Sequence, residues 1–199
     1  MQNIQRKKSL INTLYVKKHI KFSFTNQLEM TELYRSLKID YPKFFKMDGL
    51  SKLGFLASEL IFRDDENRFV PNEKTAMVFF NRSSSLDIDT QYQETIRDNE
   101  SYFPSPSLFV YTLPNIVAGE IAIRNKFFGE TFFYICKFFD ATQMVRAVAN
   151  SFQDQNTNAV LAAWIEHFEV KREVLMILVQ NGKEGTAFTE EQLSKLYYE

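Results

Sequence analysis

The stretch that decides the fold runs from Leu108 to Glu169 and reads LFVYTLPNIVAGEIAIRNKFFGETFFYICKFFDATQMVRAVANSFQDQNTNAVLAAWIEHFE. Leu113-Pro114-Asn115 opens a helix that is apolar on most sides, which is the pattern of a buried helix. Thr131–Cys136 is an aromatic strand, and Asp140 can cap a second helix. Ala159–Ile165 is the next strand. This order of helix, strand, helix and strand predicts helices packed on a sheet.

Strand and helix patterns continue on both sides of this stretch. Thr75–Asn81 is short and continuously apolar, as a central strand is. Arg172–Gln180 predicts another strand, and the partial alternation in Leu14–Thr25 predicts a half-exposed one. Asp48 can cap a helix whose apolar residues recur at helical spacing up to Ile61. Because strands alternate with helices, we expect an α/β fold, with a mixed, mainly parallel sheet and helices on both faces.

Length and composition limit the class of protein. The 199 residues suit a single domain, 1–199, and 45% of them are apolar, which is too many for a disordered chain. A net charge of −1 provides no basic field for nucleic acid. A single cysteine suits a reducing compartment, and no apolar run reaches the roughly 20 residues of a membrane-spanning helix. We expect a cytoplasmic protein without a membrane span or a nucleic-acid partner.

Residues 113–124, LPNIVAGEIAIR, resemble the middle of the N-terminal half of β-ketoacyl-acyl carrier protein synthases, the thiolase-like condensing enzymes. Gly129 stands where that family has Gly-Pro before its central strand. A weaker likeness lies in the Phe, Met-Asp and apolar helix of residues 44–61. The resemblance covers roughly residues 44–180. It implies a thiolase-like half, and the length of the chain predicts only the first of the family's two halves.

In this family the central strand leads to a cysteine at the start of a buried helix, and that cysteine accepts the acyl group. Counted from Gly129, its position falls on Phe138. The only cysteine, Cys136, lies two residues earlier, inside the predicted strand. A nucleophilic cysteine needs a lowered pKa and a nearby base or helix terminus. We therefore interpret Cys136 as a small buried hydrophobic residue. The alternative is a two-residue slip that brings its thiol to the helix.

Other residues that carry chemistry are scarce. His19 and His167 are the only histidines, and the resembled family takes its catalytic histidines from the second half. We expect His167 at the surface or in an interface. Two histidines predict no zinc site, and no cofactor-binding motif is present, so we expect neither a metal nor a cofactor. Ser83–Ser85 is expected to be a solvated loop, with binding of a phosphate or pantetheine arm as the alternative.

The aromatic strand also suggests an interface. The resemblance implies that the equivalent strand pairs with its twin across a two-fold axis. An exposed apolar edge strand invites aggregation unless another chain covers it. The expected interface residues are Phe132, Phe133, Tyr134, Ile135 and Phe138. Burial of the strand inside one chain, under a helix, is the alternative.

Three functions follow from these observations. The absent nucleophile favours a non-catalytic, ketosynthase-like accessory subunit for chain assembly of the fatty-acid or polyketide type, similar to chain length factors. Such a subunit would form a homodimer or a heterodimer with a full-length ketosynthase, and acyl carrier protein would be a further partner. The first alternative is an active acyltransferase of the β-ketoacyl synthase type that uses Cys136 with residues from a partner chain. The second is a dimeric scaffold or ligand-binding protein that kept only the fold.

Overall fold

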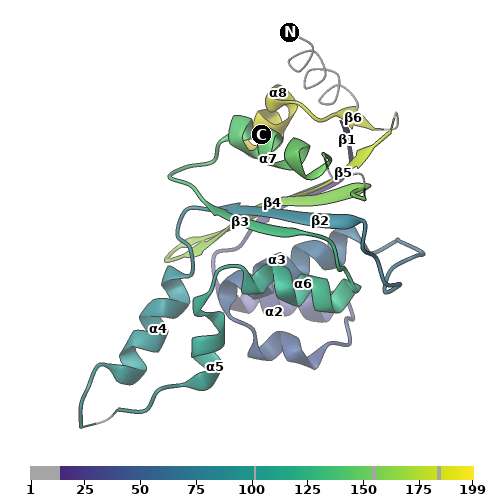
Figure 1. The fold of residues 1–199 in the computed structure, drawn as a ribbon. Coiled ribbons are helices and arrows are strands. Elements are labelled where there is room, and N and C mark those ends of the chain that lie inside the picture. The colour runs from purple at the N-terminus through teal and green to yellow at the C-terminus, as the bar shows by residue number, and fades with distance from the viewer. Residues whose placement is uncertain (1–13, 101, 154–155, 183–184) are drawn as a thin grey trace.

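A computed structural model describes residues 14–100, 102–153, 156–182 and 185–199, and the statements below concern these residues. They form one sheet with the strand order β3-β2-β4-β5-β1-β6. Helices α2, α3 and α6 cover one face of the sheet, and α7 and α8 cover the other (Figure 1). The α/β class and the helices on both faces are therefore confirmed.

The bounds of the elements agree with most of the sequence-based expectations. The strands are β1 (Leu14–Ser23), β2 (Thr75–Asn81), β3 (Thr131–Ile135), β4 (Ala159–Phe168), β5 (Lys171–Asn181) and β6 (Thr186–Ala187). The α-helices are α2 (Gln27–Ser36), α3 (Gly49–Ile61), α4 (Leu86–Ile96), α5 (Pro106–Phe109), α6 (Ile116–Asn125), α7 (Ala141–Ser151) and α8 (Glu190–Tyr198). Two 3-10 turns, η1 (Pro42–Lys46) and η2 (Val110–Thr112), precede α3 and α6.

The sheet is mixed, but its parallel share is smaller than expected. Within the described residues, β2 runs parallel to β3 and β4, whereas the pairs β4–β5, β5–β1 and β1–β6 are antiparallel. The reason is the tight turn at Glu169-Val170, which sets Phe168 opposite Lys171. A two-residue connection can only join antiparallel strands. Glu169 adopts a φ of 53°, as such turns require, although no glycine or asparagine marks the turn in the sequence.

The core consists of two apolar clusters separated by the sheet. Phe55, Phe79 and Ile165 belong to the cluster on the side of α3 and α6. Val78 and Trp164 belong to the cluster on the side of α7 and α8. All seven residues of β2 are buried, because helices cover both sides of this central strand.

The predicted helix caps at Asp48 and Asp140 are confirmed, and the structure has a third at Thr189. The Asp48 carboxylate accepts hydrogen bonds from the N–H groups of Leu50 and Ser51 at the start of α3. Asp140 caps α7, and Thr189 caps α8. Each cap satisfies backbone donors that the helix itself cannot pair.

Helix α6 differs from the expectation in where it begins and in which of its side chains are buried. It begins at Ile116 rather than at Pro114. Most of its residues are buried or half-buried, as expected, but Ile123 is 65% exposed, and the polar Glu120 and Asn125 are among the buried ones. The buried polar groups are paired: Tyr111 donates a hydrogen bond of 3.0 Å to Glu120 Oε1, and Asn125 Nδ2 donates one of 3.0 Å to the carbonyl of Ile121.

In the described part of the chain, no single helix combines the length and apolar character needed to cross a membrane. One sharply bent pair, Pro106–Thr112 with Ile116–Asn125, meets the requirement by length and composition alone.

Candidate functional site

Strand β3 lies at the edge of the sheet with an apolar surface. It pairs with β2 on its inner side, and no described strand pairs with its outer side. Phe132 and Tyr134 are each 40% exposed, Ile135 is 58% exposed, and Phe138 just beyond the strand is 63% exposed. Phe133 differs from them because its ring packs against the core on the α3 side. Four of the five residues expected in an interface therefore lie exposed along one edge, and no helix among the described residues buries them.

The turn after β3 does not place a nucleophile at a helix start. Cys136 lies one residue beyond β3, and its N–H donates a hydrogen bond of 2.8 Å to the carbonyl of Asn81. The thiol is partly exposed rather than buried, and its Sγ donates to Oε1 of Gln143 at 3.5 Å. Phe138, the position that the resemblance assigns to the nucleophile, lies in the turn before α7, which begins at Ala141. Neither residue lies within α7, although the Cys136 thiol contacts the Gln143 side chain in its first turn.

The surroundings of Cys136 keep its thiol protonated. Partial burial raises the pKa of the thiol, and the negative charge of Asp140 raises it further. Asp140 Oδ1 also accepts the N–H of Gln143 at 3.0 Å, so a carboxylate already occupies the positive end of α7. Because the thiolate is the reactive form, a raised pKa makes Cys136 a weak nucleophile at neutral pH.

The expectation that His167 lies at the surface is wrong. Its side chain is buried, with a residue exposure of 3%, and its ring packs so closely on α3 that a Cβ added to Gly49 would overlap it. Strand β4 runs three residues beyond the predicted end at Ile165, which carries His167 under the helix. Desolvation lowers the pKa of His167, partly opposed by Asp87, whose Oδ2 lies 3.6 Å from Nδ1.

Neither histidine is placed to serve Cys136 as a base. His167 packs against α3, whereas Cys136 packs against the cluster on the α7 side of the sheet. His19 lies on β1, which β2, β4 and β5 separate from β3 in the sheet. Among the described residues, no group of three or more His, Cys, Asp or Glu side chains is arranged to hold a metal ion.

A cavity of about 550 Å³ opens beside this turn, at the carboxyl ends of β2 and β4. Its lining includes the aromatic side chains of Phe138, Phe139, Trp164 and Tyr197. Phe139 stacks on Tyr197 with ring centres 3.8 Å apart and meets Trp164 edge to face at 5.7 Å. Ligands of α/β proteins commonly bind at the carboxyl ends of parallel strands, so this cavity and the β3 edge together form the candidate functional site.

Two buried polar groups in this cavity escaped the sequence analysis. Glu166 Oε2 accepts the N–H of Arg82 at 2.8 Å. Its Oε1 and Nε1 of Trp164 are buried and find no hydrogen-bond partner in the described part of the chain. One acceptor and one donor beside the cavity therefore lack, among the described residues, the partner that buried polar atoms usually have. The signal available in the sequence was the lone glutamate that follows the apolar run AVLAAWI.

The serine loop is only partly solvated. Ser83 lines the same cavity. Ser85 is buried, donates a hydrogen bond of 2.8 Å to the carbonyl of Thr112, and lies 3.0 Å from Oδ2 of Asp89. The expected solvated loop is therefore wrong for Ser85, whose hydroxyl joins α4 to η2 instead of facing a ligand.

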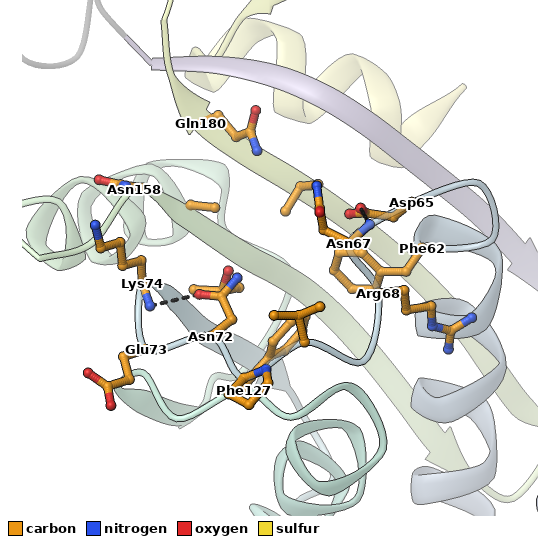
Figure 2. Close-up of a pocket in the computed structure, with 15 residues that line it drawn as sticks. Phe62, Asp65, Asn67, Arg68, Asn72, Glu73, Lys74, Phe127, Asn158 and Gln180 are labelled. Carbon is orange, nitrogen blue, oxygen red and sulfur yellow. Dashed lines mark hydrogen bonds between the residues drawn. The ribbon is translucent and has the colours of Figure 1, made fainter.

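A second cavity, of about 580 Å³, lies at the opposite end of β2 and β4 (Figure 2). Phe62, Phe127 and Leu178 form its apolar part, and the N–H of Lys74 donates a hydrogen bond of 2.8 Å to Asn72 Oδ1 at its rim. Gly129, part of the sequence resemblance, packs close by: a Cβ there would overlap the carbonyl oxygen of Thr75. Glycine is thus required where the chain enters β3 beside β2.

Comparison of the sequence with known proteins gives no match: no protein-family model fits the chain, and no curated protein is significantly similar to it. Solved structures do match. A chain in the complex of a ketosynthase with its chain length factor from Xenorhabdus doucetiae aligns with a TM-score of 0.63 and 15% identity, covering 93% of this chain and 90% of that one.

Two further structures match over a smaller share of their own length. The ishigamide ketosynthase/chain length factor aligns with a TM-score of 0.66 and 16% identity, over 84% of this chain and 62% of that chain. A type II polyketide synthase acyl-carrier protein in complex with its ketosynthase bound to the hexaketide aligns with a TM-score of 0.64 and 10% identity, over the same shares. The chain therefore has the thiolase-like fold of ketosynthases and chain length factors.

Proposed function

We propose that this chain is a non-catalytic, ketosynthase-like accessory subunit that pairs with a full-length ketosynthase through the outer edge of β3. The observation that carries the proposal is the position of β3: an exposed, apolar edge strand that no described strand pairs with. An added strand would pair the free backbone groups of this edge, while the side chains supply apolar contact. The structures with the same fold that are named above include complexes of a ketosynthase with a chain length factor.

The chemistry around the turn supports a non-catalytic role. The thiol of Cys136 has a raised pKa, and the described surroundings give it no histidine. Phe138 occupies the position that the resemblance gives to the nucleophile. A subunit that contributes only fold and interface needs none of these groups. We place it in the cytoplasm, where a lone thiol stays reduced.

The experiment begins with native mass measurement of the tagged chain isolated from its own cells. We expect a heterodimer or a higher complex that contains a full-length ketosynthase. The ketosynthase from this complex is then recombined with the Ile135→Asp variant of the chain, which changes a residue of β3. A charge at this exposed apolar position leaves the free chain folded and weakens pairing by about tenfold or more, because the carboxylate is desolvated in the interface.

Leu28→Asp is the matched control, since Leu28 is 62% exposed on α2, away from β3. It introduces the same charge and should leave pairing unchanged. A chain that forms only homodimers in its own cells, or a ketosynthase complex equally tolerant of both variants, would contradict the proposal. In the first case the chain is a self-associating scaffold, and in the second the interface lies elsewhere.

A separate measurement addresses the enzymatic alternative. Condensation by the reconstituted pair on acyl carrier protein thioesters should require the accessory chain and should be unchanged by Cys136→Ala. Loss of condensation with Cys136→Ala, in a variant that still pairs, would instead show that the thiol carries the acyl group. Cys136→Ser is a second variant, and it keeps the size of the side chain.

A further inference from the structure

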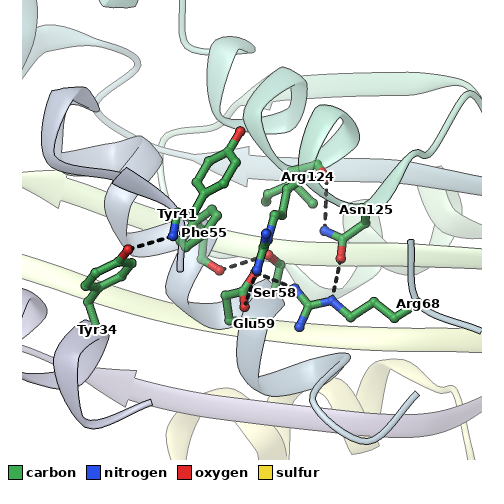
Figure 3. Close-up of polar contacts among 9 residues, drawn as sticks. Tyr34, Tyr41, Phe55, Ser58, Glu59, Arg68, Arg124 and Asn125 are labelled. Atoms are coloured by element: carbon green, nitrogen blue, oxygen red, sulfur yellow. Dashed lines mark hydrogen bonds and ion pairs between the residues drawn. The ribbon is translucent and has the colours of Figure 1, made fainter. Parts of the chain in front are cut away.

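An ion cluster with an unbalanced charge lies on the α3–α6 side of the sheet, away from the candidate site. Glu59 of α3 lies between Arg68, from the loop after α3, and Arg124 of α6 (Figure 3). Arg124 Nε is 2.9 Å from Glu59 Oε1, and Arg68 Nη2 contacts the same oxygen. The side chains are 5% exposed for Glu59, 11% for Arg68 and 18% for Arg124.

One carboxylate cannot neutralise two guanidinium groups, and arginine stays protonated in proteins. The other hydrogen-bond acceptor of Arg68 is neutral, because its Nε donates to Oδ1 of Asn125 at 3.0 Å. The nearly buried cluster therefore keeps one positive charge in excess. A poorly compensated buried charge is costly, so a nearby anion would be favourable.

Aromatic rings hold the two guanidinium groups in place. Arg124 lies 4.9 Å from the ring centre of Tyr41 and 4.8 Å from that of Phe69, and Arg68 lies 4.6 Å from the ring of Phe69. Such contacts are weak attractions between a cation and a ring face, and they only partly offset the excess charge. They also fix the guanidinium planes, so little side-chain freedom is lost when a ligand binds.

A cavity of about 230 Å³ opens onto this cluster. Glu59, Arg68 and Arg124 line it, and Lys38, Arg63 and Asp40 complete its set of charged side chains. Four cations against two carboxylates leave an excess of two positive charges. Lys38, Asp40 and Arg63 are exposed at the rim, so the cavity is open to solvent.

We propose that this cavity is a binding site for a phosphate-class dianion, either free phosphate or the phosphate group of a small ester. A phosphate monoester carries about −1.5 to −2 charges at neutral pH, which matches the excess of two. The N–H groups of the two guanidiniums that Glu59 and Asn125 do not use can donate to its oxygen atoms, and the positive field of the cavity attracts it. The site is independent of any ketosynthase partner, because every residue in it belongs to one chain.

The test uses the full chain labelled with ¹⁵N-arginine and titrated at constant ionic strength with inorganic phosphate. We expect saturable shifts of the Arg68 and Arg124 guanidinium signals, chiefly those of the Nη groups, because each Nε already donates to Asn125 or Glu59. Glycerol phosphate in a second arm shows whether an ester is accepted, and acetate in a third arm supplies a single charge. Shifts with phosphate and not with acetate support the dianion site, whereas equal response to acetate would show a general anion cluster and overturn the proposal.

Rim variants separate binding from folding. Arg63→Gln and Lys38→Gln remove exposed charges, and each should weaken phosphate binding roughly twofold to fivefold, with a larger loss in the double variant. Lys17→Gln on β1 is the matched control for charge and exposure, and it should bind as the unmodified chain does. Absence of saturable shifts, or equal weakening by Lys17→Gln, would contradict the proposal. Neither result depends on the outcome of the pairing experiment.

Discussion

The backbone N–H of Arg82 donates a hydrogen bond of 2.8 Å to Oε2 of Glu166, which joins the residue after β2 to the end of β4. This contact sets two neighbouring parallel strands against each other at the edge of the cavity beside β3. The Glu166 side chain is buried, so water competes little for this bond.

Two replacements of Glu166 distinguish its role as a hydrogen-bond acceptor from the effect of its negative charge. Glu166→Ala leaves the Arg82 N–H without its acceptor and should lower the free energy of unfolding by about 1–3 kcal/mol. Glu166→Gln keeps an oxygen acceptor and removes a buried charge, so we expect a smaller loss. Urea unfolding of the two variants measures both values. Equal losses would show that the charge, rather than the hydrogen bond, stabilises this end of the sheet.

Close packing between Gly49 and His167 gives a second prediction. A methyl group at position 49 would overlap the imidazole, which is itself confined between β4 and α3. Gly49→Ala should therefore destabilise the protein by about 1–3 kcal/mol through overpacking. The double variant Gly49→Ala with His167→Ala should lose less than the sum of the two single losses, because the smaller side chain frees the space. Additive losses in a double-mutant cycle would contradict this packing.

His167 should also make stability depend on pH. Desolvation, together with the charges of Arg172 and Lys52, lowers its pKa in the folded protein below the ordinary value of 6.5, and Asp87 opposes this only in part. Below 6.5 the unfolded chain takes up a proton that the folded chain resists, so stability is complete above 6.5 and falls as the pH drops toward the folded-state pKa. Urea unfolding at pH values on both sides of 6.5 measures the slope.

His167→Gln cannot take up this proton, and the variant should lose that part of the slope. His19→Gln is the matched control, because it removes the other histidine and leaves His167 in place. An unchanged slope in His167→Gln would assign the pH dependence to other groups.

Asp140 should influence both α7 and the thiol of Cys136. Burial is the larger cause of the raised pKa of Cys136, and the charge of Asp140 is the second. Asp140→Asn keeps a capping oxygen and removes the charge, so the thiol pKa should fall and labelling of Cys136 at neutral pH should become faster. Asp140→Ala should in addition cost about 0.5–2 kcal/mol of stability through loss of the cap. A labelling rate that does not change in Asp140→Asn would show that burial alone sets the pKa.

Local signals allowed much of the fold to be predicted from the sequence. The apolar run Thr75–Asn81 became β2 with the same bounds, and Asp48 and Asp140 cap the helices that follow them. These features depend on residues near one another in the chain, where spacing and capping chemistry act directly. The resemblance around LPNIVAGEIAIR likewise led to the fold that the structural comparisons show.

The sequence did not predict the contacts between segments that are distant in the chain. The turn at Glu169-Val170 carries none of the usual turn residues, so the antiparallel pairing of β4 with β5 was not apparent. His167 is buried only because β4 extends under α3. The candidate site was predicted in part: the edge position of β3 was expected, whereas Glu166 in the neighbouring cavity was not.

By itself, the sequence determined the α/β order of elements, the buried central strand and the absence of a second cysteine, because these follow from composition and short-range periodicity. Only the tertiary structure decided that Cys136 stops short of α7, that Phe133 faces the core while its neighbours stay exposed, and that Arg68 and Arg124 share Glu59. The physical reason is that burial, pKa and charge balance depend on which distant segments meet. The packing of helices on both faces of the sheet determines which segments meet.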